Sequence, residues 1–343
     1  SSQLSLQEIP TSIQGQELWV YLEGPHQTEL TESKQINYQH HLFSDSLSYL
    51  LGRKSSPKRV QELNPKPNQP DTDWYQFTAI KGETINILNS GRTWYSPPIR
   101  QNQSFNIQVN LSSGISRPWL ISGKLMAQSF SPSTMRILTG NDLLAEIPFE
   151  PIPNTTYGIK GQEMIFEEEI NPTSGNLGQI RFTFQGSSGN DAGHLDYLVI
   201  GKPVNGENPD LGLVASATAG SLQIPSGRKA WEVSDFFNPL MTNELEIVGK
   251  KFFVFDPDEL PSLSLSTNVA LSPRLTSEVS LVIITPVLLQ NAARKLQAHK
   301  EALGIPTAVW TTNEIYDAFG YGNPDISAIR NAIAHQFHFK GGL

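Results

Sequence analysis

Two pairs of histidines are the residues of this chain whose type and spacing could bind a metal ion. His40 and His41 are adjacent and lie near Asp45, and His335 and His338 are three residues apart in a predicted helix. Adjacent residues of a strand point to opposite faces, so His40 and His41 are poorly placed to bind one ion. The spacing of His335 and His338 suits zinc, but no third ligand is close in the sequence. We therefore predict structural or surface roles for both pairs.

Acidic residues in two predicted turns could supply oxygen ligands to calcium. Asp256, Asp258 and Glu259 flank Pro257, and residues 190–194 read Asn-Asp-Ala-Gly-His. Calcium takes about six to eight oxygen ligands, and neither run has the fuller set that a dedicated site needs. We predict that 256–259 forms a cap or turn and that 190–194 is a hairpin tip. Calcium is the one cofactor that the sequence leaves open.

Two further motifs contain residue types found in ligand-binding loops. Residues 90–95 read Ser-Gly-Arg-Thr-Trp-Tyr, and an arginine between aromatic rings can stack on a ring or bind a carboxylate. We favour a structural role, with Arg92 paired to an acid at the edge of the core and Trp94 packed beneath it. Gly320-Tyr321-Gly322 is not a phosphate-binding loop, because it follows a predicted helix rather than a strand.

The absence of cysteine excludes several kinds of chemistry. The 343 residues contain none, so the chain has no disulfide, thiolate metal site or cysteine nucleophile. We predict that it carries no catalytic, cofactor-binding or metal-binding residue.

The charge and the hydropathy of the sequence argue against nucleic acid as a partner and against a membrane-spanning segment. The net charge is −8, and the one basic cluster, Arg53-Lys54 with Lys58-Arg59, lies in a Ser/Pro-rich stretch that predicts a solvated loop. Nucleic-acid binding needs clustered Lys and Arg, so we expect no such partner. No segment approaches the ~20 apolar residues of a membrane span. No signal peptide is present either, although a leader removed ahead of Ser1 is compatible with the sequence.

Residues 1–275 have the pattern of short β-strands. Phe105, Ile107 and Val109 alternate with polar residues, which predicts that they share one buried face. Short strands separated by turn signals predict a β-sandwich or jelly roll. The candidate strands are 18–22, 74–80, 105–109, 119–127, 135–138, 143–149, 163–170, 179–185, 195–201, 212–217, 244–248 and 251–255.

Two breaks and one change of pattern suggest the domain boundaries. Residues 53–72 are polar and Pro-rich, as in a long loop or linker, and 257–276 lack a clear period. We therefore expect an N-terminal β-region (1–85), a β-sandwich-like domain (86–276) and an α/β segment (277–343).

The α/β segment begins with an apolar strand. Leu281–Ile284 is a continuous apolar run, typical of a strand buried on both faces, and 307–310 forms a second strand. A helix is expected to open at Pro286 and to end at Gly304. Its apolar residues recur at helical spacing and predict a packed face made of Leu288, Leu289, Ala292, Ala293, Leu296 and Leu303.

Two more helices complete the segment. One is predicted over 312–319, and the last opens at Pro324 and Asp325 with a packed face of Ile326, Ile329, Ile333 and Phe337. This order begins a doubly wound parallel sheet. Because two parallel strands cannot bury both faces, we expect 277–343 to be an incomplete domain and the least stable part of the chain.

The α/β segment resembles the opening of the gingipain-type (C25) cysteine peptidase domain. The resemblance is carried by LVIITP (281–286), ARKLQAHK (293–300), GIPTAV (304–309), EIYDAFGYG (314–322) and DISAIRN (325–331). Upstream strings resemble the region before that domain in the sortases of the type IX secretion system, and they are YLEGPH (21–26), FSDSLSYLL (43–51), SGRTWY (90–95), LDYL (195–198) and AWEVS (230–234).

The resemblance implies a caspase-like fold whose His–Cys dyad lies in a later part of the domain. No catalytic residue therefore carries over, and this chain alone should be inactive. The whole protein would be exported and associated with the outer membrane of a Gram-negative bacterium, at the cell surface or in the periplasm. It would cleave C-terminal sorting domains from exported cargo and join the new end to a surface glycolipid.

The partners that this implies are the exported cargo and other outer-membrane proteins of the secretion system. Two other interpretations remain open. One is a β-sandwich module that binds protein or glycan, and the other is the N-terminal part of a secreted gingipain-type protease.

Overall fold

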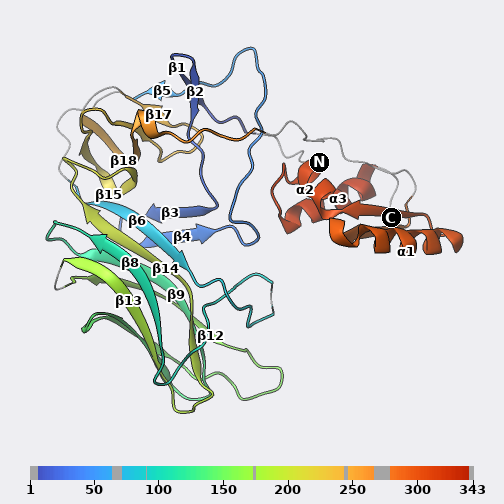
Figure 1. Ribbon diagram of the computed structural model, residues 1–343, viewed down its shortest axis with the longest axis horizontal. Coiled ribbons are helices and arrows are strands. Elements are labelled where there is room, and N and C mark those ends of the chain that lie inside the picture. Colours follow the sequence, from blue (N-terminus) through green and yellow to red (C-terminus); the bar gives the residue numbers. More distant parts are fainter. Residues whose placement is uncertain are drawn as a thin grey trace. The chain divides into compact units, whose positions relative to one another are not determined.

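The chain is mainly β and forms two compact units (Figure 1). A computed structural model describes residues 7–63, 72–89, 91–172, 175–242, 246–265 and 279–339. The larger unit contains Ser1–His40 and Ser56–Leu260, and the smaller contains His41–Ser55 and Pro261–Leu343. A β-rich chain with a C-terminal α/β segment confirms the predicted fold class. The expected division of the β-rich part between residues 85 and 86 stays a prediction.

Two sheets dominate the larger unit. The smaller sheet has the order β11-β10-β13-β8, and the larger has the order β12-β9-β14-β6-β15-β18-β16-β17-β5, with β7 beside β14. The first sheet consists of β8 (Ser104–Ser112), β10 (Ser133–Thr139), β11 (Asp142–Phe149) and β13 (Asn176–Gln185). The second consists of β5 (Gln61–Glu62), β6 (Trp74–Lys81), β7 (Ile99–Arg100), β9 (Trp119–Gln128), β12 (Gln162–Ile170), β14 (Ala192–Val204), β15 (Gly212–Gln223), β16 (Lys229–Glu232), β17 (Leu240–Met241) and β18 (Glu246–Phe255).

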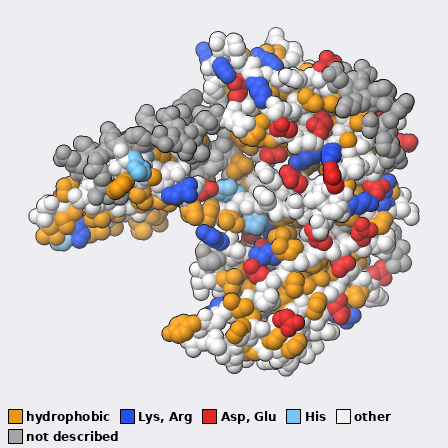
Figure 2. Space-filling model, turned by 180° about the vertical axis from the view of Figure 1, so that it is seen from behind, with side chains coloured by type: hydrophobic (Ala, Val, Ile, Leu, Met, Phe, Trp, Pro, Cys, Tyr) orange, Lys and Arg blue, Asp and Glu red, His pale blue; other side chains and the backbone are white. Residues whose placement is uncertain are grey.

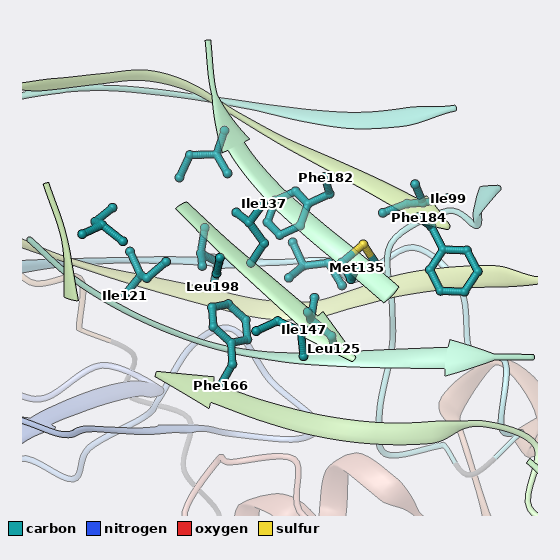
Figure 3. Packing of buried hydrophobic residues seen from close by; sticks show 14 of the residues in the cluster. Ile99, Ile121, Leu125, Met135, Ile137, Ile147, Phe166, Phe182, Phe184 and Leu198 are labelled. Atoms are coloured by element: carbon teal, nitrogen blue, oxygen red, sulfur yellow. The ribbon is translucent and has the colours of Figure 1, made fainter. Parts of the chain in front are cut away.

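The main core lies between these sheets (Figure 3). Met135, Ile137 and Phe182 come from the smaller sheet, and Leu125 and Leu198 come from the larger one. The predicted stripe of Phe105, Ile107 and Val109 packs against this core, which confirms the alternation seen in the sequence.

A hairpin covers part of the other face of the larger sheet. It is formed by β3 (His26–Leu30) and β4 (Ile36–His40), and its Ile36 and Tyr38 pack against Tyr75, Tyr197 and Val199. Strand β14 is consequently buried along almost its whole length. A second hairpin is formed by β1 (Thr11–Gln14) and β2 (Glu17–Val20).

Part of the predicted basic loop is built into the fold. The main chains of Thr11 and Val60 are joined by a 3.1 Å hydrogen bond, and the Lys58 ammonium lies 2.9 Å from the Asn238 side-chain oxygen. The prediction of a solvated loop is therefore wrong for Lys58, because the burial of Val60 holds this stretch in place. Arg59 is exposed, as predicted. Arg53 and Lys54 are exposed as expected. Residues 64–71 and 266–276 of the two predicted breaks, 244–245 of a predicted strand, and Ser90 lie outside the described residues.

The smaller unit contains a parallel pair of strands and three helices. The strands are β19 (Leu281–Thr285) and β20 (Thr307–Thr311), and a short 3-10 turn at Val287–Leu289 precedes the first helix. The helices are α1 (Gln290–Ala302), α2 (Thr312–Phe319) and α3 (Ile326–Phe339). Thr311 and Glu314 form a capping box at the start of α2, which fixes its first turn. In the described ranges, none of the helices is long and apolar enough to cross a membrane.

The predicted packed face of α1 is correct for Ala293 and wrong for its leucines. Ala293 is the one buried residue of this helix, and the Gln297 side chain donates to the Thr307 carbonyl oxygen at 2.7 Å. The leucines are exposed: Leu288 is 92% and Leu296 is 46% exposed. A small residue therefore allows close approach to the sheet, and no described element covers the large ones. Strand β19 is only half-buried for the same reason.

Helix α3 repeats this arrangement. Its buried residues are Ala328, Ala332 and Gln336, whereas Ile333 is 36% and Phe337 is 57% exposed. Of the four residues predicted to pack, only Ile329 contacts the core of this unit.

Candidate functional site

A cluster of charged side chains lies on the larger sheet, on the face opposite the main core. The ammonium of Lys124 in β9 is 2.9 Å from a carboxylate oxygen of Glu163 in β12 and 3.3 Å from one of Asp196 in β14. The buried Tyr95 hydroxyl donates a hydrogen bond to the same oxygen of Glu163. Lys124, Glu163, Asp196 and Tyr95 are called the Lys124 cluster from here on.

A register shift in β14 places Asp196 in this cluster. Leu195 pairs with Leu125, and Tyr197 pairs with Lys124, so Asp196 is an extra residue without a partner in β9. A bulge of this kind re-aims a side chain that would otherwise continue the alternation. The Asp196 carboxylate thereby reaches Lys124, although its side chain is only 5% exposed.

The loop that carries Tyr95 closes the bulge. Ser96 N–H donates to the Leu195 carbonyl at 2.8 Å, and Gly82 N–H donates to the Asp196 carbonyl at 2.7 Å. A Cβ on Gly82 would lie 2.2 Å from the Leu195 carbonyl oxygen, so only glycine allows this approach. The loop satisfies the main-chain groups that the bulge removes from the ladder.

The charges of the cluster depend on one another. Burial opposes the charged form of Glu163, but the bonds from Tyr95 and Lys124 outweigh it and lower the pKa of Glu163. Burial likewise opposes the charged form of Lys124, and its two carboxylate neighbours nevertheless raise its pKa. Burial dominates at Asp196 and raises its pKa. Lys124 thus forms an ion pair with Glu163 and lies between it and Asp196, whose pKa is raised.

Aromatic rings from the β3–β4 hairpin adjoin the cluster. Tyr38 lies 4.8 Å from Tyr197 between ring centroids, and His40 lies 6.4 Å from the same ring. Burial, and next the charge of Lys81, lower the pKa of His40. His40 is therefore a neutral packing residue at pH 7. An open hollow of about 430 Å³, lined by Leu88 and residues 158–163, lies beside Glu163.

This arrangement has no group placed for catalysis. The Tyr95 hydroxyl already donates to Glu163, and burial together with that bond raises the pKa of Tyr95 far above its usual value. Both carboxylates face the same ammonium, so neither is free to act as a base. The cluster joins one loop to three strands and stiffens this end of the sheet.

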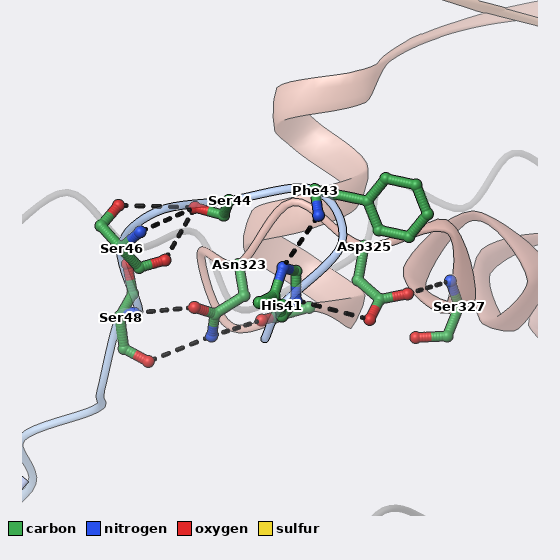
Figure 4. A network of polar contacts seen from close by, with 9 residues as sticks. His41, Phe43, Ser44, Ser46, Ser48, Asn323, Asp325 and Ser327 are labelled. Carbon is green, nitrogen blue, oxygen red and sulfur yellow. Dashed lines mark hydrogen bonds and ion pairs between the residues drawn. The ribbon is translucent and has the colours of Figure 1, made fainter. Parts of the chain in front are cut away.

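The histidines that the sequence singled out lie in separate surroundings. His41 lies in the smaller unit, where its Nε2 is 3.7 Å from an Asp325 carboxylate oxygen (Figure 4). His335 lies against the Phe319 ring, and His338 lies against the Phe337 ring. In the described ranges, no group of three or more His, Cys, Asp or Glu side chains is placed to hold a metal ion.

The two acidic turns differ from each other. Asp256 caps a single 3-10 turn (Pro257–Glu259) and accepts from the Asp258 N–H at 2.9 Å, as the sequence predicts. Asp191 closes the β13–β14 turn by accepting from Ser187 and Ser188 at 2.9 Å. The prediction that His194 belongs to the tip is wrong, because β14 begins at Ala192 and buries His194.

The structure reveals two residues that sequence reasoning missed. In the 90–95 motif the buried residue is Tyr95, while Trp94 is 42% exposed rather than packed beneath Arg92. The glycine-rich turn at 320–322 leads to Asn323, which contacts Ser48 far away in the sequence. Nothing in the local pattern around Tyr95 or Asn323 indicates these partners.

The smaller unit matches a known protein family. Residues 274–339 match the model of Peptidase family C25. This range holds β19, α1, β20, α2 and α3, which carry the resemblance described above. No curated protein sequence matches the chain.

The fold of nearly the whole chain matches a solved structure. The crystal structure of dimeric latent PorU from Porphyromonas gingivalis aligns with a TM-score of 0.68 and 15% identity, covering 95% of this chain and 34% of that one. The chain thus spans about a third of the length of PorU. It is a β-rich protein with a C25 peptidase segment. Its fold is, more particularly, PorU-like.

Smaller carbohydrate-binding modules align only with parts of the chain. The CBM36-1 domain of a multidomain xylanase from the hindgut metagenome of Trinervitermes trinervoides has a TM-score of 0.27 and 14% identity, covering 36% of this chain and 96% of that one. A CBM36 module in complex with calcium and xylotriose has a TM-score of 0.26 and 10% identity, covering 35% and 97%. These scores carry no conclusion about ligands.

Replacing Glu163 tests the Lys124 cluster. A carboxylate with a lowered pKa stabilises the fold above its unfolded value, about 4.3, and loses this contribution as the pH falls through its folded value. We expect Glu163→Gln to be less stable than the wild type by about 1 kcal/mol at pH 7. The difference should shrink as the pH falls below the unfolded value of about 4.3 and through the lower folded value, in urea unfolding measured across this range.

Glu168→Gln on the same strand is the matched control, because Glu168 is exposed like Glu163 but does not contact Lys124 or Tyr95. It should follow the wild-type curve at every pH. A pH-independent loss in Glu163→Gln, or an equal loss in the control, contradicts the electrostatic account.

Proposed function

We propose that this chain is the non-catalytic N-terminal part of a type IX secretion signal peptidase and sortase. The whole protein cleaves C-terminal sorting domains from exported proteins and attaches those proteins to the cell surface. The observation that supports this most strongly is the extent of the PorU-like fold, which covers 95% of the chain. The likeness includes the β-rich unit as well as the C25 segment, which favours a sortase over a secreted gingipain-type protease.

The proposed role of this chain follows from the chemistry of cysteine peptidases. In a cysteine peptidase a thiolate attacks the substrate carbonyl, and a histidine takes and returns the proton. This chain has no cysteine and contributes no thiolate to this reaction. Its proposed role is to position the peptidase domain and to dock partners through the β-rich unit.

The proposed role implies the partners and the location of the protein. They are exported cargo proteins with C-terminal sorting domains and other outer-membrane proteins of the secretion system. The protein acts in association with the outer membrane of a Gram-negative bacterium, at the cell surface or in the periplasm. The PorU-like fold is the support for each of these assignments.

Exposed apolar side chains support a place for the smaller unit within a larger peptidase domain. Leu288 and Leu303 at α1 and Phe337 on α3 are 92%, 61% and 57% exposed. Hydrophobic side chains gather on this unit, at the left of Figure 2. An α/β domain buries such stripes against further strands and helices. We propose that the rest of a C25 domain packs on these faces.

Substitutions in α1 test this packing. The exposed pair Leu288→Glu and Leu296→Glu should leave the hydrogen exchange of 281–311 in this chain unchanged, because neither side chain is packed. Ala293→Glu, at a buried position, should speed it strongly. In the full-length gene product, the double substitution of these leucines should also destabilise the protein.

Two outcomes contradict the packing proposal. Either the leucine pair unfolds this unit as readily as Ala293→Glu does, or it leaves the full-length product as stable as the wild type.

Deleting the gene in its host tests the function itself. Exported proteins should then keep their C-terminal sorting domains, and the full-length gene should restore their removal. Mass spectrometry of C-terminal peptides from many exported proteins is the measurement. Normal processing in the deleted strain rules out the sortase role, and a loss of general proteolysis alone points to a gingipain-type protease.

A further inference from the structure

The smaller unit includes a segment that is far from the rest of it in the sequence (Figure 4). His41–Ser55 belongs to this unit together with Pro261–Leu343, whereas the match to the C25 family begins at residue 274. Residues 41–55 are called segment 41–55, and residues 320–325, between α2 and α3, are called the α2–α3 loop. A domain boundary drawn at the family match would leave out part of this unit.

Both ends of segment 41–55 continue into residues that are fixed in the larger unit. Strand β4 ends at His40, whose ring lies 6.4 Å from that of Tyr197. After the segment, the Thr11 N–H donates to the Lys58 carbonyl at 3.1 Å, and Val60 is buried. A segment fixed at both ends loses less conformational freedom on packing than a free tail does. Its contacts in the smaller unit are therefore favoured by the fold of the larger one.

The strongest polar contact of the segment is made by Asn323. The Ser48 N–H donates to the Asn323 side-chain oxygen at 2.7 Å, and the Asn323 side-chain nitrogen donates to the Ser48 carbonyl at 3.0 Å. The same nitrogen donates to the Gly320 carbonyl at 3.1 Å. One carboxamide thus joins the segment to the turn that ends α2. Gly322 has a φ of 86°, and its missing Cβ allows this turn and the close approach of Ser48.

A second polar contact lies at the other end of the α2–α3 loop. The His41 Nδ1 accepts from the Phe43 N–H at 3.2 Å, and its Nε2 faces an Asp325 carboxylate oxygen at 3.7 Å. Asp325 also accepts from the Ser327 N–H at 2.6 Å and so caps α3. The segment therefore contacts the loop both where α2 ends and where α3 begins.

Apolar side chains of the segment are packed as well. Phe43, Leu47 and Leu50 are half-buried, whereas Leu42 and Leu51 are 43% and 68% exposed. Removing apolar surface from water favours the packed position of the segment. Segment 41–55 is therefore held by apolar contacts and hydrogen bonds together.

Helix α3 has few large buried side chains of its own. Ala328 and Ala332 are buried, but Ile333 is 36% and Phe337 is 57% exposed. Elements with few buried apolar contacts open locally at a low free-energy cost. Contacts that fix the loop before α3 consequently have a large effect on the order of this helix.

We infer that segment 41–55 is a positioning element through which the β-rich unit fixes the α2–α3 loop and orders α2 and α3 of the C25 segment. It supplies a physical element for the positioning role proposed above, and it rests on that proposal only for the peptidase that α2 and α3 belong to.

The first test removes the contacts of the segment in the 343-residue chain. The triple variant Phe43→Ser, Leu47→Ser, Ser48→Pro loses two packed side chains and the N–H that Asn323 binds. Hydrogen exchange of residues 312–339, measured by mass spectrometry, should become at least about tenfold faster, because several contacts are lost together. The exchange of β14 should stay unchanged.

The double variant Leu42→Ser, Leu51→Ser is the matched control, because it makes the same kind of change in the segment at exposed positions. It should leave the exchange of 312–339 as in the wild type. An unchanged rate in the triple variant overturns the inference, and so does an equal rise in the control or in β14.

The second test asks whether Asn323 acts through the segment. Asn323→Ala should speed the exchange of 312–339 about fivefold in the wild-type chain, and less than about twofold in the triple variant, where its partner is already lost. Asn313→Ala, at an exposed position of α2, should speed it in neither chain. An equal effect of Asn323→Ala in both chains overturns the inference, because Asn323 then acts only within its own loop.

Both tests use the 343-residue chain and need no peptidase activity. Normal processing of exported proteins in the deleted strain would therefore remove the sortase role and leave these results unchanged. Unchanged exchange in the triple variant would remove the positioning element and leave the sortase role standing.

Discussion

The larger unit is organised around one strand that must be covered on both faces. Strand β14 is buried along nearly its whole length. Leu195, Leu198 and Ile200 enter the core between the sheets, while Tyr197 and Val199 face the other way. Exposing the apolar side chains of this outer face to water would be unfavourable, and the β3–β4 hairpin covers them. The bulge at Asp196 then brings a carboxylate to the edge of this covered face, and Lys124 and Tyr95 become necessary partners in the same network.

The smaller unit shows what happens when such cover is missing. Helix α1 approaches the two-stranded sheet through Ala293, and α3 packs on α2 with Ala328 and Ala332 buried. The larger apolar residues of α1 and α3 remain exposed. Helix-capping hydrogen bonds stabilise this unit locally, among them the capping box at Thr311 and the cap at Asp325. His41 and Ser48 add long-range contacts to this part of the unit. The proposed fit into a larger peptidase domain rests on the exposed apolar residues.

Features that depend on near neighbours in the sequence were predictable. The alternation around Ile107 and the end of α2 at Gly320 are local patterns, and both are found in the structure. Contacts between distant residues were not. Tyr95 and Glu163 are 68 residues apart, and Ser48 and Asn323 are 275 apart. The leucine face of α1 was misassigned because a helical period shows that a stripe is apolar, but not whether a described element covers it.

The central claim is that the PorU-like fold belongs to a sortase whose chemistry lies in the rest of the peptidase domain. Its most direct test is the intact mass of the product when the full-length gene product acts on a cargo protein with a C-terminal sorting domain, in the presence of a small amine. The account predicts a cargo shortened at one position, whose new C-terminus carries the amine. Unchanged cargo, or cleavage by water alone at many positions, contradicts it.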